Sequence, residues 1–379
     1  MSDNRNEKAA KRARIKEIKK FNNQKYREYN QMKKRKNIPE TEYYTEMRDE
    51  NNLVEFDNLQ TYFYTDNGTV KSVDGVTFDI PKGKTIGIVG ESGCGKSVTS
   101  LSLMQLLQGP QGQIAGGEIR YNKEGHAIDI TKVPIRDMTK IRGNEIAMIF
   151  QEPMTSLNPV FTIGDQLAEI IELHNPEMKK EDVKKRVIEL LRMVGIAREG
   201  IENSYPHELS GGMKQRIVIA MALSCNPRLI IADEPTTALD VTIQAQVLDL
   251  LRHLKDQINA SIMLITHDLG VVAEMADLIV VMYAGRVIER GTASDIFHDP
   301  RHPYTIGLLK SRPVLNEEVG RLYSIPGNVP NPINMPNHCY FKNRCEMCKE
   351  VCDSPYPGLK QVSETHFVAC HLYNDMNDK

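Results

Sequence analysis

The stretch that most restricts the fold of this chain is residues 90–97, which read Gly-Glu-Ser-Gly-Cys-Gly-Lys-Ser. They fit the pattern G-x-x-x-x-G-K-[ST], in which glycines let backbone N–H groups turn toward phosphate oxygens. Lys96 would bring a positive charge to the outer phosphates, and Ser97 would offer a hydroxyl to Mg²⁺. An apolar run, residues 85–89, precedes the motif, and residues 98–104 follow it without Gly or Pro. The stretch therefore predicts a strand, a phosphate-binding loop and a helix.

The length of the chain, 379 residues, predicts two or three structural units. No run approaches the roughly 20 apolar residues of a membrane-spanning helix. The first residues, Met-Ser-Asp-Asn-Arg, contain no apolar stretch of the kind found in signal peptides. We therefore expect the protein in the cytoplasm.

The first 36 residues are strongly basic, with 14 Lys and Arg against 4 Asp and Glu. Apolar residues recur among them at roughly helical spacing, namely Ile15, Ile18, Tyr26, Tyr29 and Met32. Two interpretations stay open for an N-terminal extension over residues 1–50. It is either a solvated, partly disordered tail, or a basic helix that rests on anionic lipid or on a partner.

Three short apolar runs later in the chain end in polar residues that can do chemistry. Gln151 ends the first run, Asp233 and Glu234 end the second, and His267 follows the third. Beside a phosphate-binding loop, Asp233 would hold Mg²⁺ through water, and Glu234 would act on the attacking water as base or orienter. Taken alone, Gln151 could equally be a loop amide and His267 a structural histidine.

Residues 161–205 have the apolar spacing of helices, and we expect an inserted helical subdomain there. Beyond it, Ser210, Gly211 and Gly212 stand directly before an apolar helix. This arrangement would present free N–H groups and the positive end of a helix dipole to an anion. The simpler alternative is that Ser210 only caps the helix.

Taken together and in this order, the motifs resemble the nucleotide-binding subunits of ATP-binding-cassette (ABC) transporters. The resemblance covers about residues 53–295 and rests on the loop 90–97, Gln151, residues 209–215, Asp233-Glu234, residues 238–240 and His267. It implies an α/β fold of the P-loop NTPase type, with an antiparallel β subdomain, an inserted α-helical subdomain at about residues 152–225 and a small Cys-rich C-terminal region. The implied division is a nucleotide-binding domain over 51–300 and a C-terminal region over 301–379.

The resemblance also implies that ATP and Mg²⁺ are bound. The catalytic residues would be Glu234, His267, which holds the attacking water, and Gln151, which senses the γ-phosphate. Mg²⁺ would be held by Ser97, Gln151 and Asp233. The adenine base would stack on Phe63, with Tyr62 or Tyr64 as less favoured positions. The residues expected around the phosphates are Gly90, Glu91, Ser92, Gly93, Cys94, Gly95, Lys96 and Ser97.

ABC subunits work as head-to-tail dimers, and the resemblance implies the same here. ATP would lie between the phosphate-binding loop of one subunit and residues 209–215 of the other, which we call the signature segment. Ser210 and Gly212 would serve the partner's ATP, and Asp240 would bridge the two sites. Gly211 and Gln215 of the same segment are also expected to take part in nucleotide binding. All residues needed for hydrolysis are present in the sequence, so an active ATPase is expected.

The end of the chain resembles the tail of oligopeptide and dipeptide importer ATPases, through residues 297–305, Ile325-Pro326-Gly327 and the prolines up to Pro336. This implies an ATPase at the cytoplasmic face of the membrane, bound to a second homologous ABC ATPase, two permeases and an extracellular peptide-binding protein. The alternatives are a nickel or glycoside importer of the same subfamily, a drug exporter, and an ABC ATPase acting on nucleic acid or ribosomes. We expect no nucleic-acid partner, because the chain has a single phosphate-binding loop and an importer-like tail.

Five of the seven cysteines lie between residues 339 and 370. Cys339, Cys345, Cys352 and Cys370 have the spacing by which some members of the same subfamily bind a [4Fe–4S] cluster, which four thiolates suit. Cys348 adds a fifth thiol, and the nearby histidines, His338, His366 and His371, make zinc an alternative. Cysteines without metal are the third possibility.

Overall fold

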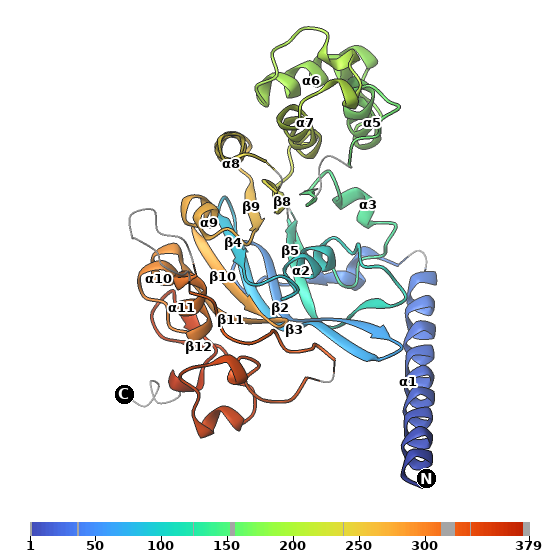
Figure 1. Ribbon diagram of the computed structural model, residues 1–379. Coiled ribbons are helices and arrows are strands. Elements are labelled where there is room, and N and C mark those ends of the chain that lie inside the picture. Colours follow the sequence, from blue (N-terminus) through green and yellow to red (C-terminus); the bar gives the residue numbers. More distant parts are fainter. Residues whose placement is uncertain are drawn as a thin grey trace.

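The computed structural model describes residues 2–35, 38–123, 125–151, 156–237, 239–311, 323–333 and 335–373. Two sheets form the body of the molecule (Figure 1). One has five strands in the order β1-β6-β5-β2-β3, and the other has eight in the order β12-β13-β11-β10-β4-β9-β8-β7. Two parts of the sequence predictions lie outside the described residues: residues 152–155, at the start of the expected helical subdomain, and Ala238 of the motif 238–240.

The five-stranded sheet is antiparallel throughout. Its long hairpin alternates buried and less buried side chains, as a sheet with one face on the core requires. The strands are β1 (Tyr44–Thr45), β2 (Asn52–Thr65), β3 (Gly68–Pro81), β5 (Gly112–Lys123) and β6 (His126–Asp129).

The eight-stranded sheet is parallel in its centre, where β10, β4, β9, β8 and β7 pair in the same direction. Every residue of β4, β8 and β9 is buried, as expected for parallel strands with both faces covered. Because the carboxyl ends of parallel strands meet at one edge, the loops after them are brought together. The strands are β4 (Thr85–Val89), β7 (Ile146–Ile149), β8 (Leu229–Asp233), β9 (Ser261–Ile265), β10 (Leu278–Tyr283), β11 (Arg286–Thr292), β12 (Lys360–Gln361) and β13 (Phe367–Val368).

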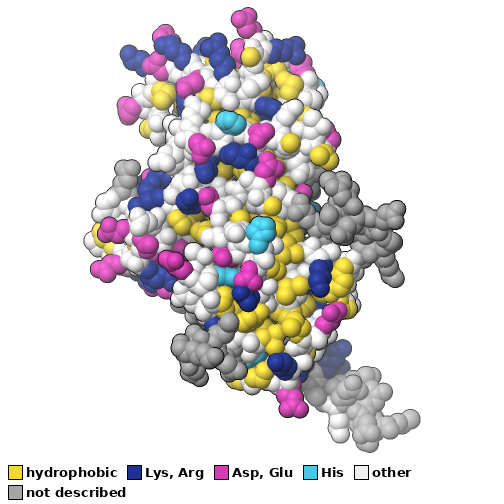
Figure 2. All heavy atoms as spheres, turned by 90° about the vertical axis from the view of Figure 1, so that its left-hand side faces the viewer, with side chains coloured by type: hydrophobic (Ala, Val, Ile, Leu, Met, Phe, Trp, Pro, Cys, Tyr) yellow, Lys and Arg dark blue, Asp and Glu magenta, His cyan; other side chains and the backbone are white. Residues whose placement is uncertain are grey.

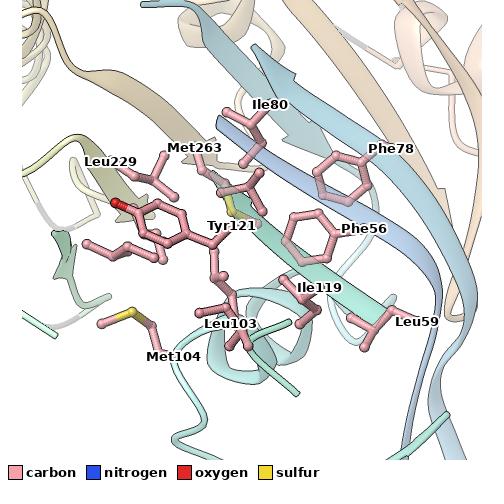
Figure 3. Packing of buried hydrophobic residues seen from close by; sticks show 14 of the residues in the cluster. Phe56, Leu59, Phe78, Ile80, Leu103, Met104, Ile119, Tyr121, Leu229 and Met263 are labelled. Atoms are coloured by element: carbon pink, nitrogen blue, oxygen red, sulfur yellow. The ribbon is translucent and has the colours of Figure 1, made fainter. Parts of the chain in front are cut away.

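One core joins the two sheets (Figure 3). Phe56 and Phe78 stack with ring centroids 4.4 Å apart, and Tyr121 extends from the antiparallel sheet toward Leu229 and Met263 of the parallel one. All five side chains are fully buried. The antiparallel sheet is therefore packed firmly against the sheet that carries the phosphate-binding loop.

Three helices, α5 (Ile163–His174), α6 (Lys180–Met193) and α7 (Gly211–Leu223), form the end of the molecule at the top of Figure 1. They share a second core with buried residues of α8 (Val241–Ile258). Figure 2 shows charged side chains of both signs gathered at this end. On α6, Lys185 pairs with Asp182 and Arg186 pairs with Glu189, and three of these four side chains are largely exposed.

Five further α-helices among the described residues are α2 (Lys96–Leu103), α3 (Met138–Ile141), α9 (Leu269–Met275), α10 (Ala293–His298) and α11 (Pro303–Lys310). Short 3₁₀ helices cover Glu40–Tyr43 (η1), Ile201–Asn203 (η2), Pro206–Glu208 (η3), Lys342–Arg344 (η4) and Glu350–Asp353 (η5). No helix among the described residues is both long and apolar enough to cross a bilayer.

The basic N-terminal segment forms a 33-residue helix, α1 (Ser2–Lys34), along one side of the molecule (Figure 1). The segment is thus helical, while a role of this helix on lipid or on a partner stays a prediction. Its second half is attached to the end of β2, where the Phe21 ring meets Tyr64 with centroids 5.8 Å apart. Asn22 Nδ2 donates to the Thr65 carbonyl, and the Tyr26 hydroxyl donates to the Tyr64 carbonyl.

The C-terminal region returns to the edge of the parallel sheet, where β13 pairs with β11. Buried Glu289 of β11 binds three residues that follow it in the chain. Its carboxylate accepts hydrogen bonds from the backbone N–H groups of Arg301 and His302, and its Oε1 lies 2.8 Å from His366 Nε2. Figure 2 views the molecule from this side and shows hydrophobic side chains gathered in its lower half.

Candidate nucleotide-binding site

The loop between β4 and α2 approaches neighbouring backbone so closely that a side chain at two of its glycines would force that backbone to shift. A Cβ on Gly90 would lie 2.2 Å from the Met282 carbonyl oxygen, and one on Gly95 would lie 2.4 Å from the Ser72 carbonyl oxygen. Gly95 also has a backbone φ of 103°, which residues with a side chain rarely adopt. A Cβ on Gly93 would meet nothing within 4 Å, so this side of the loop is open to a ligand.

Lys96 begins α2 and is only 7% exposed. Its Nζ donates to the carbonyl oxygens of Gly90 at 2.7 Å and Glu91 at 3.3 Å. Both acceptors belong to the loop, so the positive charge is kept inside the turn. A loop that is open on one side at Gly93 and holds a buried ammonium group fits the phosphates of a nucleotide.

Ser97 and Asp233 form the next part of the site. The Ser97 hydroxyl donates to Asp233 Oδ1 at 3.1 Å, which joins the start of α2 to the end of β8. Burial raises the pKa of the Asp233 carboxyl, and the neighbouring charge of Glu234 raises it further. A buried carboxylate beside a hydroxyl is a set of oxygen ligands that suits Mg²⁺.

Glu234 is the meeting point of the predicted catalytic residues. Its Oε1 lies 3.2 Å from His267 Nδ1, and its Oε2 accepts from Gln151 Nε2 at 3.3 Å and from the Thr237 hydroxyl at 3.1 Å. Its φ of 47° is uncommon for a residue with a side chain, and its N–H donates to the Ile265 carbonyl. Strained residues of this kind cluster at functional sites.

The sequence analysis did not single out Thr237. The signal for it is its position three residues after Glu234, within the turn that carries the carboxylate. In that turn the Thr237 N–H donates to the Glu234 carbonyl, which directs the Thr237 hydroxyl back toward the carboxylate.

The signature residues fall into two environments. Ser210 is exposed and caps α7, accepting from the Met213 N–H at 3.4 Å, and Gly211 and Gly212 follow it in the first turn. Gln215 is fully buried, and its Nε2 donates to the Pro235 carbonyl at 2.6 Å. Gln215 therefore faces the interior of its own protomer, behind the loop that carries Glu234. Contact of these residues with a second protomer stays a prediction.

The three aromatic residues at the end of β2 have different surroundings. The Phe63 ring lies against Gly112, the Tyr62 hydroxyl donates to Asp74 Oδ1 at 2.6 Å, and Tyr64 packs on α1. Adenine stacking on Phe63 stays a prediction.

Asp240 caps α8, accepting from the Ile243 N–H at 2.9 Å. The structure thus gives this carboxylate a role within its own helix. The predicted bridge between two ATP sites is not tested by these contacts.

The cysteine cluster does not form a metal site in this structure. Burial raises the pKa of Cys339 to about 11 and that of Cys370 to about 12, and both values are raised further by the charges of Cys345 and Cys352. The thiols are thus near enough to influence one another. Among the described residues, no group of three or more His, Cys, Asp or Glu side chains is arranged to hold a metal ion. The structure therefore does not support the predicted iron–sulfur cluster or its zinc alternative.

Comparison with known proteins agrees with the geometry of the phosphate site. A family model described as ABC transporter matches residues 73–237, and one described as oligopeptide/dipeptide transporter, C-terminal region, matches residues 288–352. The oligopeptide transport ATP-binding protein AppD of Bacillus subtilis is 52% identical over 324 residues, which cover 85% of this chain and 97% of that relative. The chain belongs to the ABC transporter family of ATP-binding proteins.

Other members of the ABC family are similar along most of the chain. The dipeptide transport ATP-binding protein DppD of Bacillus subtilis is 50% identical over 316 residues, covering 83% of this chain and 93% of that relative. The ATP-binding cassette MJ0796, solved as a dimer bound to ADP and Pi, has a TM-score of 0.56 at 28% identity, covering 63% of this chain and 98% of that one. The predicted α/β fold of an ABC nucleotide-binding domain with an antiparallel sheet is thereby confirmed.

Proposed function

We propose that this ABC protein hydrolyses ATP and that the reaction powers uptake of oligopeptides or dipeptides through membrane permeases. The observation that carries the ATPase proposal is the placement of Glu234 between Gln151, Thr237 and His267, next to the Ser97–Asp233 pair. The peptide substrate is supported by the match of residues 288–352 and by the peptide-transport relatives.

In the proposed mechanism, the N–H groups of residues 90–97 and the Lys96 ammonium bind the phosphates. Ser97 and Asp233, with Gln151, would hold Mg²⁺, and a bound Mg²⁺ would neutralise negative charge on the transferred phosphoryl group. Glu234 accepts a hydrogen bond from the attacking water and takes its proton, while His267 orients that water. The protein thus contributes position and charge rather than a covalent intermediate.

The partner of each site would be a second homologous ABC ATPase, placed head to tail. Ser210, Gly211 and Gly212 of each protomer then reach the ATP of the other. Gln215 would support this turn from behind, because its bond to the Pro235 carbonyl ties α7 to the loop carrying Glu234. A movement of the start of α7 would then shift the loop that carries Glu234 through this bond.

We further propose that residues 51–300 form the nucleotide-binding domain, with α5, α6 and α7 as its inserted helical subdomain, and that residues 301–379 form a distinct C-terminal region. The helical subdomain and the Gln151 region would receive a helix from each permease. The protein would then lie on the cytoplasmic face of the membrane, with an extracellular binding protein delivering the peptide. Nickel and glycosides are the alternative substrates.

For the cysteine cluster, a [4Fe–4S] group on Cys339, Cys345, Cys352 and Cys370 is proposed from their spacing in the sequence alone. Zinc remains the alternative. Iron and acid-labile sulfide measured after anaerobic purification decide between them: zinc without iron contradicts the cluster, and neither metal contradicts both.

The transport proposal is tested by recovering partners from membranes with the Glu234→Gln variant, which should bind ATP but not complete hydrolysis and so hold the dimer closed. We expect a second ABC ATPase, two permeases and a peptide-binding protein. Glu274→Gln is the matched control, since this exposed carboxylate pairs only with Arg252 among the described contacts. Recovery of ribosomes or nucleic acid instead would contradict transport and leave the ATPase proposal standing.

A further inference from the structure

Glu91, the second residue of the phosphate-binding loop, is held at its backbone and at its side chain by the distant end of the chain. Its N–H donates to the Tyr304 hydroxyl at 2.8 Å. Its carboxylate accepts two hydrogen bonds from Arg344, from Nη1 at 2.8 Å and from Nη2 at 3.1 Å. Tyr304 lies in α11 and Arg344 in the 3₁₀ helix η4, 213 and 253 residues further along the chain.

Arg344 is placed so that it has little freedom to move. Besides binding Glu91, its guanidinium donates to the carbonyl oxygens of Pro326 and Ile325 and to the Tyr283 hydroxyl. Its side chain is 6% exposed and that of Glu91 is 26% exposed. A two-pronged pair between an arginine and a carboxylate is directional, and at such low exposure salt screens it little.

The same residue, Glu91, also contacts the phosphate-binding lysine. The Glu91 carbonyl accepts hydrogen bonds from Lys96 Nζ at 3.3 Å and from the Cys94 N–H at 3.2 Å. A rotation of the Glu91 peptide would therefore move an acceptor of Lys96 and change the turn that precedes it. Arg344 and Tyr304 oppose that rotation from outside the loop.

We propose that Arg344 is a positioning residue for ATP binding, which acts through Glu91 to hold the phosphate-binding loop and Lys96 in place, with Tyr304 as the second support. The C-terminal region then contributes to the nucleotide site of its own chain. This inference rests on the proposed role of residues 90–97 in ATP binding.

The test compares ATP hydrolysis by the full-length wild type and by Arg344→Gln. The variant loses the two guanidinium hydrogen bonds (the charged fork) to the Glu91 carboxylate. The KM for ATP should therefore rise by roughly tenfold or more, with a smaller change in kcat. Arg344→Lys keeps the charge without the fork and should lie between the two. The increase in melting temperature on adding ATP should shrink in the same order.

The matched control is Lys342→Gln, in the same 3₁₀ helix, because Lys342 pairs with Asp353 and not with the loop. Its KM should equal that of the wild type. A second variant, Glu91→Gln, changes the other partner while leaving the remaining contacts of Arg344 in place, so it tests the pair even if Arg344→Gln does not fold. The double variant should be no worse than the more affected single variant.

The inference is overturned if folded Arg344→Gln or Glu91→Gln keeps the wild-type KM, or if their effects on KM multiply in the double variant. A loss of thermal stability with KM unchanged would show that Arg344 is only structural. A wild type that does not hydrolyse ATP would instead contradict the proposed function, so the two failures are distinguishable.

Discussion

The phosphate-binding loop and the loop that carries Glu234 are held in different ways. The first is fixed by backbone approach at Gly90 and Gly95 and by a lysine that is 7% exposed. In the second, the Glu234 carboxylate is positioned by side-chain hydrogen bonds of 3.1–3.3 Å, and one partner, His267, has a side chain that is 69% exposed. Nucleotide binding is thus prepared before the ligand arrives, whereas the catalytic contacts are at the surface and are easily exchanged.

The largest expected effect separates the two loops. Glu234→Gln should lower kcat by roughly 10²–10⁴-fold, because the amide cannot take the proton of the attacking water. ATP affinity should stay near that of the wild type, since none of the Glu234 side-chain bonds reaches residues 90–97. Equilibrium binding of ATP together with steady-state hydrolysis checks both statements. A parallel loss of affinity would show that the two loops act as one unit.

The phosphate-binding loop should instead respond to an added methyl group. Gly95→Ala places a Cβ 2.4 Å from the Ser72 carbonyl oxygen at a φ of 103°, so we expect a loss of about 2–4 kcal/mol of stability together with ATP binding. Gly200→Ala is the control, because Gly200 also has positive φ but its Cβ would meet nothing within 4 Å. Denaturant unfolding measures both. Equal destabilisation would mean that backbone strain alone matters and that the close approach does not.

The sequence predicts the catalytic residues around Glu234 more readily than the residues that support the phosphate-binding loop. The apolar runs that end in Gln151, Glu234 and His267, together with the family resemblance, point to these three residues, and the structure brings their side chains together. The bond from Arg344 to Glu91 joins positions 253 residues apart through one side chain, and no periodicity or motif encodes such a pair.

The burial of Gln215 could not be predicted for a related reason. Its motif indicates an exposed helix start, and only packing against the Pro235 loop determines which way the side chain points. Local pattern therefore predicts the elements and the residues at their ends, while contacts between distant segments depend on the tertiary fold.

Acid should lower the free energy of unfolding of the chain through His302, which caps α11. His302, two residues before Tyr304, is fully buried, and burial lowers its pKa from 6.5 to about 4, against the opposing charge of Glu289. Between these values the unfolded chain binds the proton and the folded chain does not, so stability rises with pH across this window. The expected loss on acidification from pH 6.5 to 4 is about 3 kcal/mol.

Denaturant unfolding at several pH values, with His302→Asn beside the wild type, checks this effect. Asparagine keeps an acceptor for the Tyr304 N–H, which His302 Nδ1 caps at 3.0 Å, but it does not titrate. The variant should therefore lack this part of the pH dependence. An unchanged slope in the variant would assign the acid sensitivity to other groups.

The smallest expected effect tests whether the contacts around Glu234 are individually weak. Thr237→Ala removes the hydroxyl that donates to Oε2 at 3.1 Å, while the bonds to Gln151 and His267 remain. A single hydrogen bond near solvent contributes about 1 kcal/mol, so kcat should fall by about fivefold, with KM for ATP unchanged. Thr237→Ser keeps the hydroxyl and should retain most of the activity. If alanine lowered kcat as far as Glu234→Gln does, the carboxylate would depend on Thr237 for its position, and the catalytic loop would be as rigidly organised as the loop that binds phosphate.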